Sequence, residues 1–174
     1  MFTNNYINFF KGVTVGFGNT YYQLKNKNGD MVYLQGSDQS YSLGNQLASF
    51  AYANSSSMGS DYAYLALGNN DTIETADDYN VGFISGITLA VSTSYEYSNS
   101  TYISRLHFSL TNSSNEAISF KEFGIYATMR YKTEPDAASS SHDRFLIYRK
   151  VLDNTVTIQP SEGVTLTVEF STEV

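Results

Sequence analysis

The 174-residue chain contains no cysteine. This absence excludes disulfide bonds, thiolate metal sites and thiol nucleophiles together. Lysine and arginine supply only ten residues, they are scattered along the chain, and the formal net charge is −7. Nucleic acids and anionic membrane surfaces are bound by clustered cations. We therefore expect neither a nucleic acid nor a membrane as a partner.

Long apolar runs are absent as well. No stretch approaches the length of a membrane-spanning helix. Residues 1–11 (MFTNNYINFFK) lack both the basic start and the long apolar centre of a secretory signal. We therefore expect a protein that folds where it is synthesised.

Aromatic and small polar residues are abundant in this chain. It has 15 tyrosines and 11 phenylalanines, and aromatic, Thr and Val residues favour β-strands. The frequent Ser, Asn and Gly residues favour turns. The composition predicts an all-β protein.

Period-two alternation of apolar and polar residues supports this prediction. In residues 164–170 (VTLTVEF) the apolar residues all fall on one face of a strand. Residues 102–110 (YISRLHFSL) place Leu106 and Phe108 on one face and Arg105 and His107 on the other. Further strands are predicted over residues 118–131 (with a kink or bulge at Gly124), 145–151 and 155–158.

The first part of the chain is less regular. Asn28-Gly29 between two apolar runs predicts a hairpin with a type I′ turn, which needs positive φ at both central residues. Residues 42–52 are compatible with a short helix, a strand or a loop. We therefore predict an antiparallel β-sandwich of jelly-roll or immunoglobulin-like type over residues 61–174. Residues 1–60 are predicted to form an irregular N-terminal arm or hairpin region that docks on neighbouring subunits.

The sequence offers little for catalysis. His107 and His142 are the only histidines, and neither has a second ligand or a nucleophile motif at a suitable spacing. We predict that the protein is not an enzyme and needs no cofactor.

The acidic stretch over residues 69–78 is a weak candidate for Ca²⁺ binding. Its oxygen ligands are dense, but Glu74 stands where an EF-hand loop needs glycine. A solvated loop is the favoured interpretation, and the ion-binding alternative involves Asn69, Asp71, Asp77 and Asp78.

Two closely spaced tyrosine pairs, Tyr62 with Tyr64 and Tyr95 with Tyr97, are candidate ligand or interface residues. Residues two apart in a strand share a face, and exposed tyrosines stack on sugars or anchor protein interfaces. A half-buried core face is the alternative interpretation.

The order of several phrases resembles tailed-bacteriophage virion structural proteins of the tail, neck or decoration type. The phrases are residues 65–72 (LALGNNDT), 74–79 (ETADDY), 106–112 (LHFSLTN), 118–126 (ISFKEFGIY), 145–152 (FLIYRKVL) and 156–168 (VTIQPSEGVTLTV). The resemblance covers about residues 62–170. The chain departs from the family at Gly68-Asn69-Asn70, where Gly-x-Gly is usual, and at Phe123, where a small aliphatic residue is usual.

The resemblance implies a structural component of a virion, in the tail, neck, baseplate or head-decoration layer. Its partners would be other virion proteins and copies of itself, and it would be made in the cytoplasm of the host bacterium. The alternative function is a carbohydrate- or receptor-binding β-sandwich module on the particle surface.

One ion pair is predicted from the residues themselves. Glu122 precedes Phe123-Gly124, where its carboxylate would lie beside a backbone bend and could accept hydrogen bonds from the main chain or from Arg149. The alternative is two unrelated surface charges, whose pairing would contribute little to stability.

Overall fold

The computed structural model describes residues 1–8, 21–35, 63–98, 101–139 and 141–173. In this part of the chain a short helix over residues 4–8 is followed by eight strands. None of the described helical residues forms a helix long and apolar enough to cross a membrane. The strands are β1 (Tyr21–Lys25), β2 (Met31–Gln35), β3 (Ala63–Gly68), β4 (Ile87–Ser98), β5 (Thr101–Asn112), β6 (Ile118–Tyr131), β7 (Ser141–Ile158) and β8 (Gly163–Glu173).

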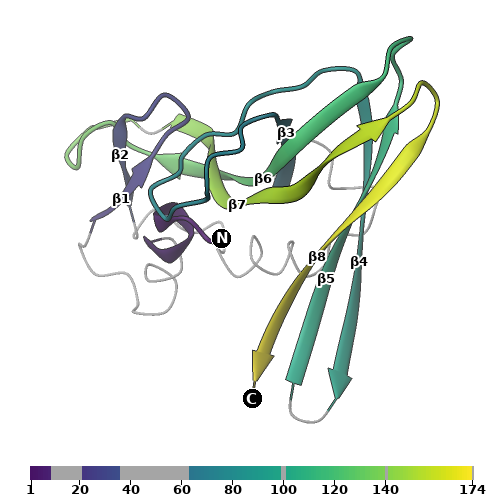
Figure 1. Ribbon diagram of the computed structural model, residues 1–174. Helices are drawn as coiled ribbons and strands as arrows, with labels where there is room; N and C mark the ends of the chain where they lie inside the picture. The colour runs from purple at the N-terminus through teal and green to yellow at the C-terminus, as the bar shows by residue number, and fades with distance from the viewer. Residues whose placement is uncertain (9–20, 36–62, 99–100, 140, 174) are drawn as a thin grey trace.

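The strands form three antiparallel sheets, with the orders β1-β2, β3-β6-β7 and β4-β5-β8. The predicted all-β class is therefore correct. The β4-β5-β8 sheet stands steeply across the β3-β6-β7 sheet, and its lower half projects away from the rest of the molecule (Figure 1).

One hydrophobic core joins the two three-stranded sheets. As the alternation in the sequence predicts, Leu106, Phe108 and Leu110 are fully buried, while Arg105 and His107 lie on the other face of β5. Phe120 and Ile125 on β6 and Phe145 on β7 complete the centre of this core. Burying each such side chain stabilises the fold by roughly 1.5–3 kcal/mol.

Strand β7 is longer than the sequence indicates. The alternation predicts residues 145–151 and 155–158 as separate strands. Instead, β7 runs from Ser141 to Ile158 and bulges, so that Lys121 of β6 lies opposite residues 152–155. Lys121 Nζ donates a hydrogen bond of 2.5 Å to the Asp153 carbonyl, which keeps the bulged segment attached to β6.

The predicted hairpin of β1 and β2 is present, but its turn is of another type. Gly29 has a φ of 89°, whereas Asn28 does not have a positive φ, so a type I′ turn is excluded. The Gly29 N–H donates to the Asn26 carbonyl and the Asn26 N–H to the Asp30 carbonyl. This is the three-residue loop in which a type I turn is followed by a glycine bulge. Asn26 selects it, because its side-chain oxygen accepts the N–H groups of Asn28 and Asp30.

The first residues of the chain attach to the edge of β7. Thr3 N–H donates to the Ile147 carbonyl at 3.1 Å, and Arg149 N–H donates to the Met1 carbonyl at 3.0 Å. The buried Asn5 side chain joins the hairpin to the same strand, since its amide donates to the carbonyls of Lys25 and Leu146. The described part of the predicted N-terminal arm thus packs on the chain's own sheets. Residues 9–20 and 36–62, which include the segment 42–52, lie outside the described residues.

Candidate functional site: a buried arginine beneath the long loop

Residues 69–86, called the long loop below, connect β3 to β4 without regular secondary structure. The loop crosses the face of the β3-β6-β7 sheet that points away from the main core. There Val81 forms a second buried cluster with Ala66, Tyr126 and Leu146. A loop of this length needs fixed contacts to hold one conformation, because ordering its backbone costs roughly 1–2 kcal/mol per residue.

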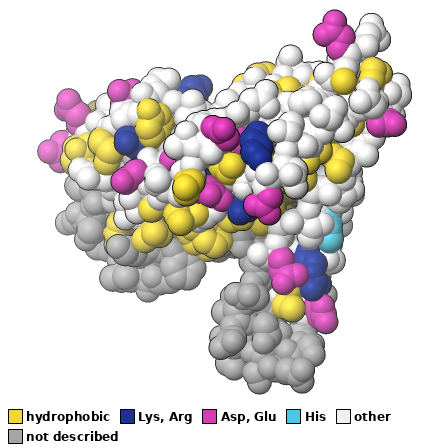
Figure 2. All heavy atoms as spheres, in the orientation of Figure 1, with side chains coloured by type: hydrophobic (Ala, Val, Ile, Leu, Met, Phe, Trp, Pro, Cys, Tyr) yellow, Lys and Arg dark blue, Asp and Glu magenta, His cyan; other side chains and the backbone are white. Residues whose placement is uncertain are grey.

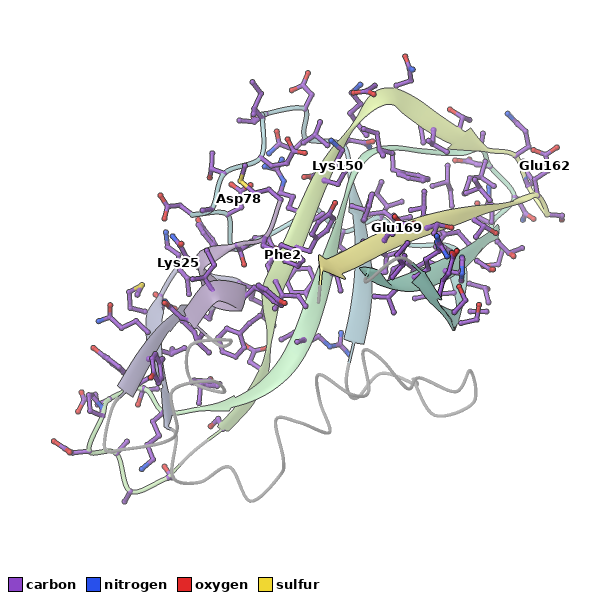
Figure 3. All side chains as sticks on the ribbon, turned by 90° about the horizontal axis from the view of Figure 1, so that it is seen from below. Phe2, Lys25, Asp78, Lys150, Glu162 and Glu169 are labelled. Atoms are coloured by element: carbon purple, nitrogen blue, oxygen red, sulfur yellow. The ribbon has the colours of Figure 1, made fainter. Side chains whose placement is uncertain are left out.

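Arg149 supplies the central contact. Its Nε donates to Glu122 Oε2 at 2.8 Å and its Nη1 donates to Asp78 Oδ2 at 2.8 Å. Its Nη2 donates to the Thr72 carbonyl at 3.1 Å. One guanidinium therefore ties β6 and β7 to two separate points of the long loop (Asp78 is labelled in Figure 3).

The predicted pair of Glu122 with Arg149 is present, and it is not a surface pair. The side chain of Glu122 is 1% exposed and that of Arg149 is 3% exposed. Buried charges are costly unless the geometry is good and the remaining hydrogen-bonding positions are filled. The rest of the site meets this requirement.

The second carboxylate oxygen of Glu122 binds the main chain of the long loop. Glu122 Oε1 accepts the Asn70 N–H at 3.3 Å and the Gly82 N–H at 3.4 Å. Gly68 lies directly opposite Glu122 in the sheet. A Cβ atom at Gly68 would lie 2.3 Å from Glu122 Oε1 and 2.9 Å from the Gly82 nitrogen. Glycine at this position therefore makes room for the carboxylate and both of its main-chain donors.

Gly124 on β6 also makes room for the long loop, at a position opposite Arg149 of β7. It was predicted to mark a kink or bulge, but it pairs regularly with Ala66 and Arg149, and the register shifts lie on either side of it. A Cβ atom at Gly124 would lie 2.6 Å from both Leu146 Cδ1 and Val81 Cγ2. The close approach of the loop residue Val81 accounts for this glycine.

Two further side chains hold the loop. The Tyr126 hydroxyl accepts the Val81 N–H at 2.7 Å and donates to Asn80 Oδ1 at 3.0 Å. Glu74 Oε1 accepts the Val151 N–H at 3.3 Å and lies 3.3 Å from Lys150 Nζ. The loop is therefore attached to the sheet near its start, its middle and its end.

Arg149 and Asp78 stabilise each other's charged forms. Burial by itself would lower the pKa of Arg149, but the hydrogen bonds and charges of Asp78 and Glu122 outweigh it and raise that pKa. Burial raises the pKa of Asp78, and the hydrogen bonds from Arg149 and Thr75 more than reverse this, so the pKa lies below its ordinary value. Neither group is suited to exchanging a proton at neutral pH, a requirement of general acid–base catalysis. The cluster is built to hold the loop.

Two of the four candidate Ca²⁺ residues, Asp77 and Asp78, have other partners. Asp78 binds Arg149 and also accepts hydrogen bonds from the Thr75 N–H and hydroxyl. Asp77 Oδ1 accepts a hydrogen bond from Asn4 Nδ2 at 2.8 Å, and Asn69 and Asp71 are exposed. Within the described residues no group of three or more His, Asp or Glu side chains could hold a metal ion.

The structure gives no side-chain description of the tyrosine pairs. Tyr62 lies outside the described residues. The main chain of Tyr64 pairs with Tyr126, that of Tyr95 with Ser104 and that of Tyr97 with Tyr102. Their interpretation as stacking or interface residues stays a prediction.

His107 contacts two hydroxyl groups on the outer face of the β4-β5-β8 sheet. Its Nε2 lies 2.9 Å from Ser94 Oγ and its Nδ1 lies 3.1 Å from Thr167 Oγ1. The row Ser94, His107 and Thr167 resembles the Ser-His-Asp catalytic triad, but the hydroxyl of Thr167 takes the place of the triad's carboxylate. These three residues line neither of the two hollows that Phe83 lines, one with Leu65 and Leu110 and the other with Val81 and Tyr126. Next to them Arg105 bridges Glu96 and Glu169, so the face carries two rows of cross-strand contacts.

The long loop exposes two large apolar side chains that sequence reasoning missed. Ile73 is 79% exposed and Phe83 is 71% exposed. Phe83 stands between two hollows, one of about 180 Å³ lined by Leu65, Ile87 and Leu110, and one of about 410 Å³ lined by Val81 and Tyr126. On the face in Figure 2, charges of both signs are intermixed among such apolar side chains, without an extended patch of one sign.

No protein-family model, no curated protein and no solved structure matches the chain.

Proposed function

We propose that the protein is a non-enzymatic structural component of a tailed-phage virion, in the tail, neck, baseplate or head-decoration layer. It assembles through β-rich interfaces with other virion proteins and with copies of itself. The observation that carries the proposal concerns the long loop. Buried contacts of Arg149 attach it to the sheet, and it exposes the side chains of Ile73 and Phe83 to solvent.

The long loop is attached to the sheet and still exposes two large apolar side chains. Large apolar side chains in water gain nothing for the isolated chain, whereas aromatic and aliphatic anchors provide much of the binding energy at protein interfaces. Holding such anchors in place beforehand reduces the entropy lost on association. The buried contacts of Arg149 and Glu122 do this for Ile73 and Phe83.

The same contacts involve the sequence phrases that resemble virion proteins. Each phrase that carries the resemblance around the long loop contributes a residue to its attachment: Gly68, Asp78, Glu122, Gly124 and Arg149. In this chain, the residues of these phrases therefore attach an exposed loop to a sheet. This supports a family of proteins that present a constant surface to neighbours.

We also propose that the fold is a two-layer β-sandwich. We take the β3-β6-β7 and β4-β5-β8 sheets as the two layers of a β-sandwich, because their buried residues form one core. Virion proteins use such domains in many identical copies, where symmetric contacts repeat.

Self-association of purified variants tests the proposal. Phe83→Ser and Ile73→Ser are compared with Met31→Ser, which removes a 48% exposed apolar side chain outside the loop. Light scattering coupled to size-exclusion chromatography is run over a wide concentration range. We expect an oligomer that is weakened by the two loop substitutions and not by the control. A wild-type chain that stays monomeric and binds no purified particle would contradict the proposal.

A further inference from the structure

The outer edges of β7 and β8, which end the two three-stranded sheets, differ in whether other main chain covers them. The edge of β7 is covered, since residues 1–3 pair with Ile147 and Arg149 and the Leu146 carbonyl accepts hydrogen bonds from Thr3 and Asn5. The outer edge of β8 has no such cover among the described residues, because β8 pairs with β5 alone. An uncovered edge presents a row of main-chain donors and acceptors to any strand that can reach it.

Strand β8 has few of the devices that normally prevent edge pairing, and its charged residues are Glu169 and the terminal Glu173. Its eleven residues contain no lysine, arginine or proline, and its register with β5 is continuous from Gly163 to Glu173, without a bulge. The charge of Glu169, labelled in Figure 3, is already paired with Arg105 at 2.8 Å. Proteins that avoid edge-to-edge association use charged side chains, proline or bulges at such positions.

The sequence of β8 is complementary to itself. Residues 164–168 read VTLTV in either direction. If two copies of β8 pair antiparallel about Leu166, Thr165 lies opposite Thr167 and Val164 opposite Val168. Glu169 then lies opposite Gly163 instead of opposite itself. The half-buried Val164 and Leu166 stay on the core side and the exposed Thr165 and Thr167 stay on the outer side.

We propose that β8 pairs with β8 of a second copy of this chain, giving a continuous six-stranded antiparallel sheet. This inference rests on the proposed function and adds to it one partner, a second copy, and one surface that is separate from Ile73 and Phe83 of the long loop. Cross-strand Thr–Thr pairs and apolar pairs stabilise such an arrangement, whereas like charges directly opposite one another destabilise it. A two-fold contact of this kind uses the same surface on both copies.

The β4 edge of the same sheet provides a matched control, since within the described strands β4 pairs with β5 alone. Ser92 and Ser94 on β4 lie on the same outer face as Thr165 and Thr167, and Ser94 binds the same His107 ring as Thr167. Double substitutions on either edge therefore remove comparable side chains and add the same charge. Circular dichroism and thermal unfolding of each variant check that the fold is kept.

The experiment measures the dimer dissociation constant by light scattering and analytical ultracentrifugation. We expect Thr165→Lys/Thr167→Lys and Thr165→Glu/Thr167→Glu each to weaken the wild-type dimer by roughly tenfold or more, since each places two like-charged pairs across the contact. An equal mixture of the two variants should recover the dimer, because lysine then faces glutamate. Ser92→Lys/Ser94→Lys should leave the dissociation constant unchanged.

Three results would overturn the pairing of β8 with itself. A dimer that is insensitive to the β8 charges excludes it, and so does a dimer that the β4 variant disrupts. A wild-type chain that is monomeric yet incorporated into particles excludes it while leaving the proposed function intact. Failure of the proposed function is separate: the protein would then be absent from particles whatever its oligomeric state.

Discussion

Arg149 on β7 and Glu122 on β6 form an ion pair of 2.8 Å beneath the long loop, and both side chains are almost completely buried. The pair is attached to the loop from both ends, through Asp78 and Thr72 on the arginine side and through Asn70 and Gly82 on the glutamate side. The stability of the fold and the presentation of Ile73 and Phe83 therefore depend on the same contacts.

Removing one partner of this pair should be severely destabilising. Arg149→Met leaves the Glu122 carboxylate buried without its counter-charge, and breaking a buried pair in this way costs about 3–5 kcal/mol. Urea unfolding of the wild type and the variant measures the loss. Arg105→Met, which removes a partly exposed arginine between two exposed glutamates, should change the unfolding midpoint little. Equal losses in the two variants would contradict this account of the buried pair.

Gly68 should not tolerate even a methyl group. Gly68→Ala places Cβ 2.3 Å from Glu122 Oε1, so the carboxylate or the loop has to move. Overpacking of this kind costs about 1–3 kcal/mol. Gly82→Ala is the control, because its Cβ has no neighbour closer than 3.4 Å. Thermal unfolding should show a clear loss for Gly68→Ala only, and a stable Gly68→Ala protein would show that the contact is not tight.

Acid should weaken the attachment of the long loop through Asp78. The pKa of Asp78 lies below its ordinary value of 3.8, chiefly because the hydrogen bonds from Arg149 and Thr75 overcome the effect of burial. A carboxyl group with a lowered pKa in the folded state contributes stability above its unfolded pKa and loses it as the pH falls through the folded pKa. The difference in unfolding free energy between the wild type and Asp78→Asn should therefore be constant at neutral pH and shrink below about pH 4. A difference that is the same at acid and at neutral pH would contradict this role of Asp78.

Asn5 should be essential for attaching the β1-β2 hairpin. Its buried side chain donates to the carbonyls of Lys25 and Leu146 and accepts the Lys25 N–H at 2.7 Å. Asn5→Ala leaves the N–H and carbonyl of Lys25 without their Asn5 partner, at a cost of about 1–3 kcal/mol, whereas the Leu146 carbonyl keeps its hydrogen bond from the Thr3 hydroxyl. Asn8→Ala removes one hydrogen bond, to the Gln23 carbonyl, at a more exposed site and should cost less. Hydrogen exchange of the Lys25 and Leu24 amides would locate the loss; unchanged exchange in Asn5→Ala would contradict the assignment.

The strands could be predicted because burial repeats every second residue. The alternation over residues 102–110 and 164–170 places Leu106, Phe108 and Val168 in the core, and the structure buries all three. Turn chemistry was less predictable. Asn28-Gly29 indicated a hairpin correctly, but the turn type depends on the Asn26 side chain, which binds the main chain two and four residues later.

The candidate site could be predicted only in part. Glu122 and Arg149 stood out as charges among apolar strand residues, and their pairing follows from the adjacency of β6 and β7. The contributions of Gly68, Asp78 and Tyr126 depend on the path of the long loop across the sheet, and no periodicity specifies that path. Exposure of Ile73 and Phe83 was unpredictable for the same reason, because apolar residues in a sequence do not reveal which of them the fold leaves uncovered.

The central claim is that the protein is a virion component. The most direct measurement is quantitative mass spectrometry of tailed-phage particles purified from a bacterial culture that produces this protein. We predict that the protein co-purifies with the particles through a density gradient at a fixed number of copies per particle. Its presence in the lysate together with its absence from the purified particles would contradict the claim.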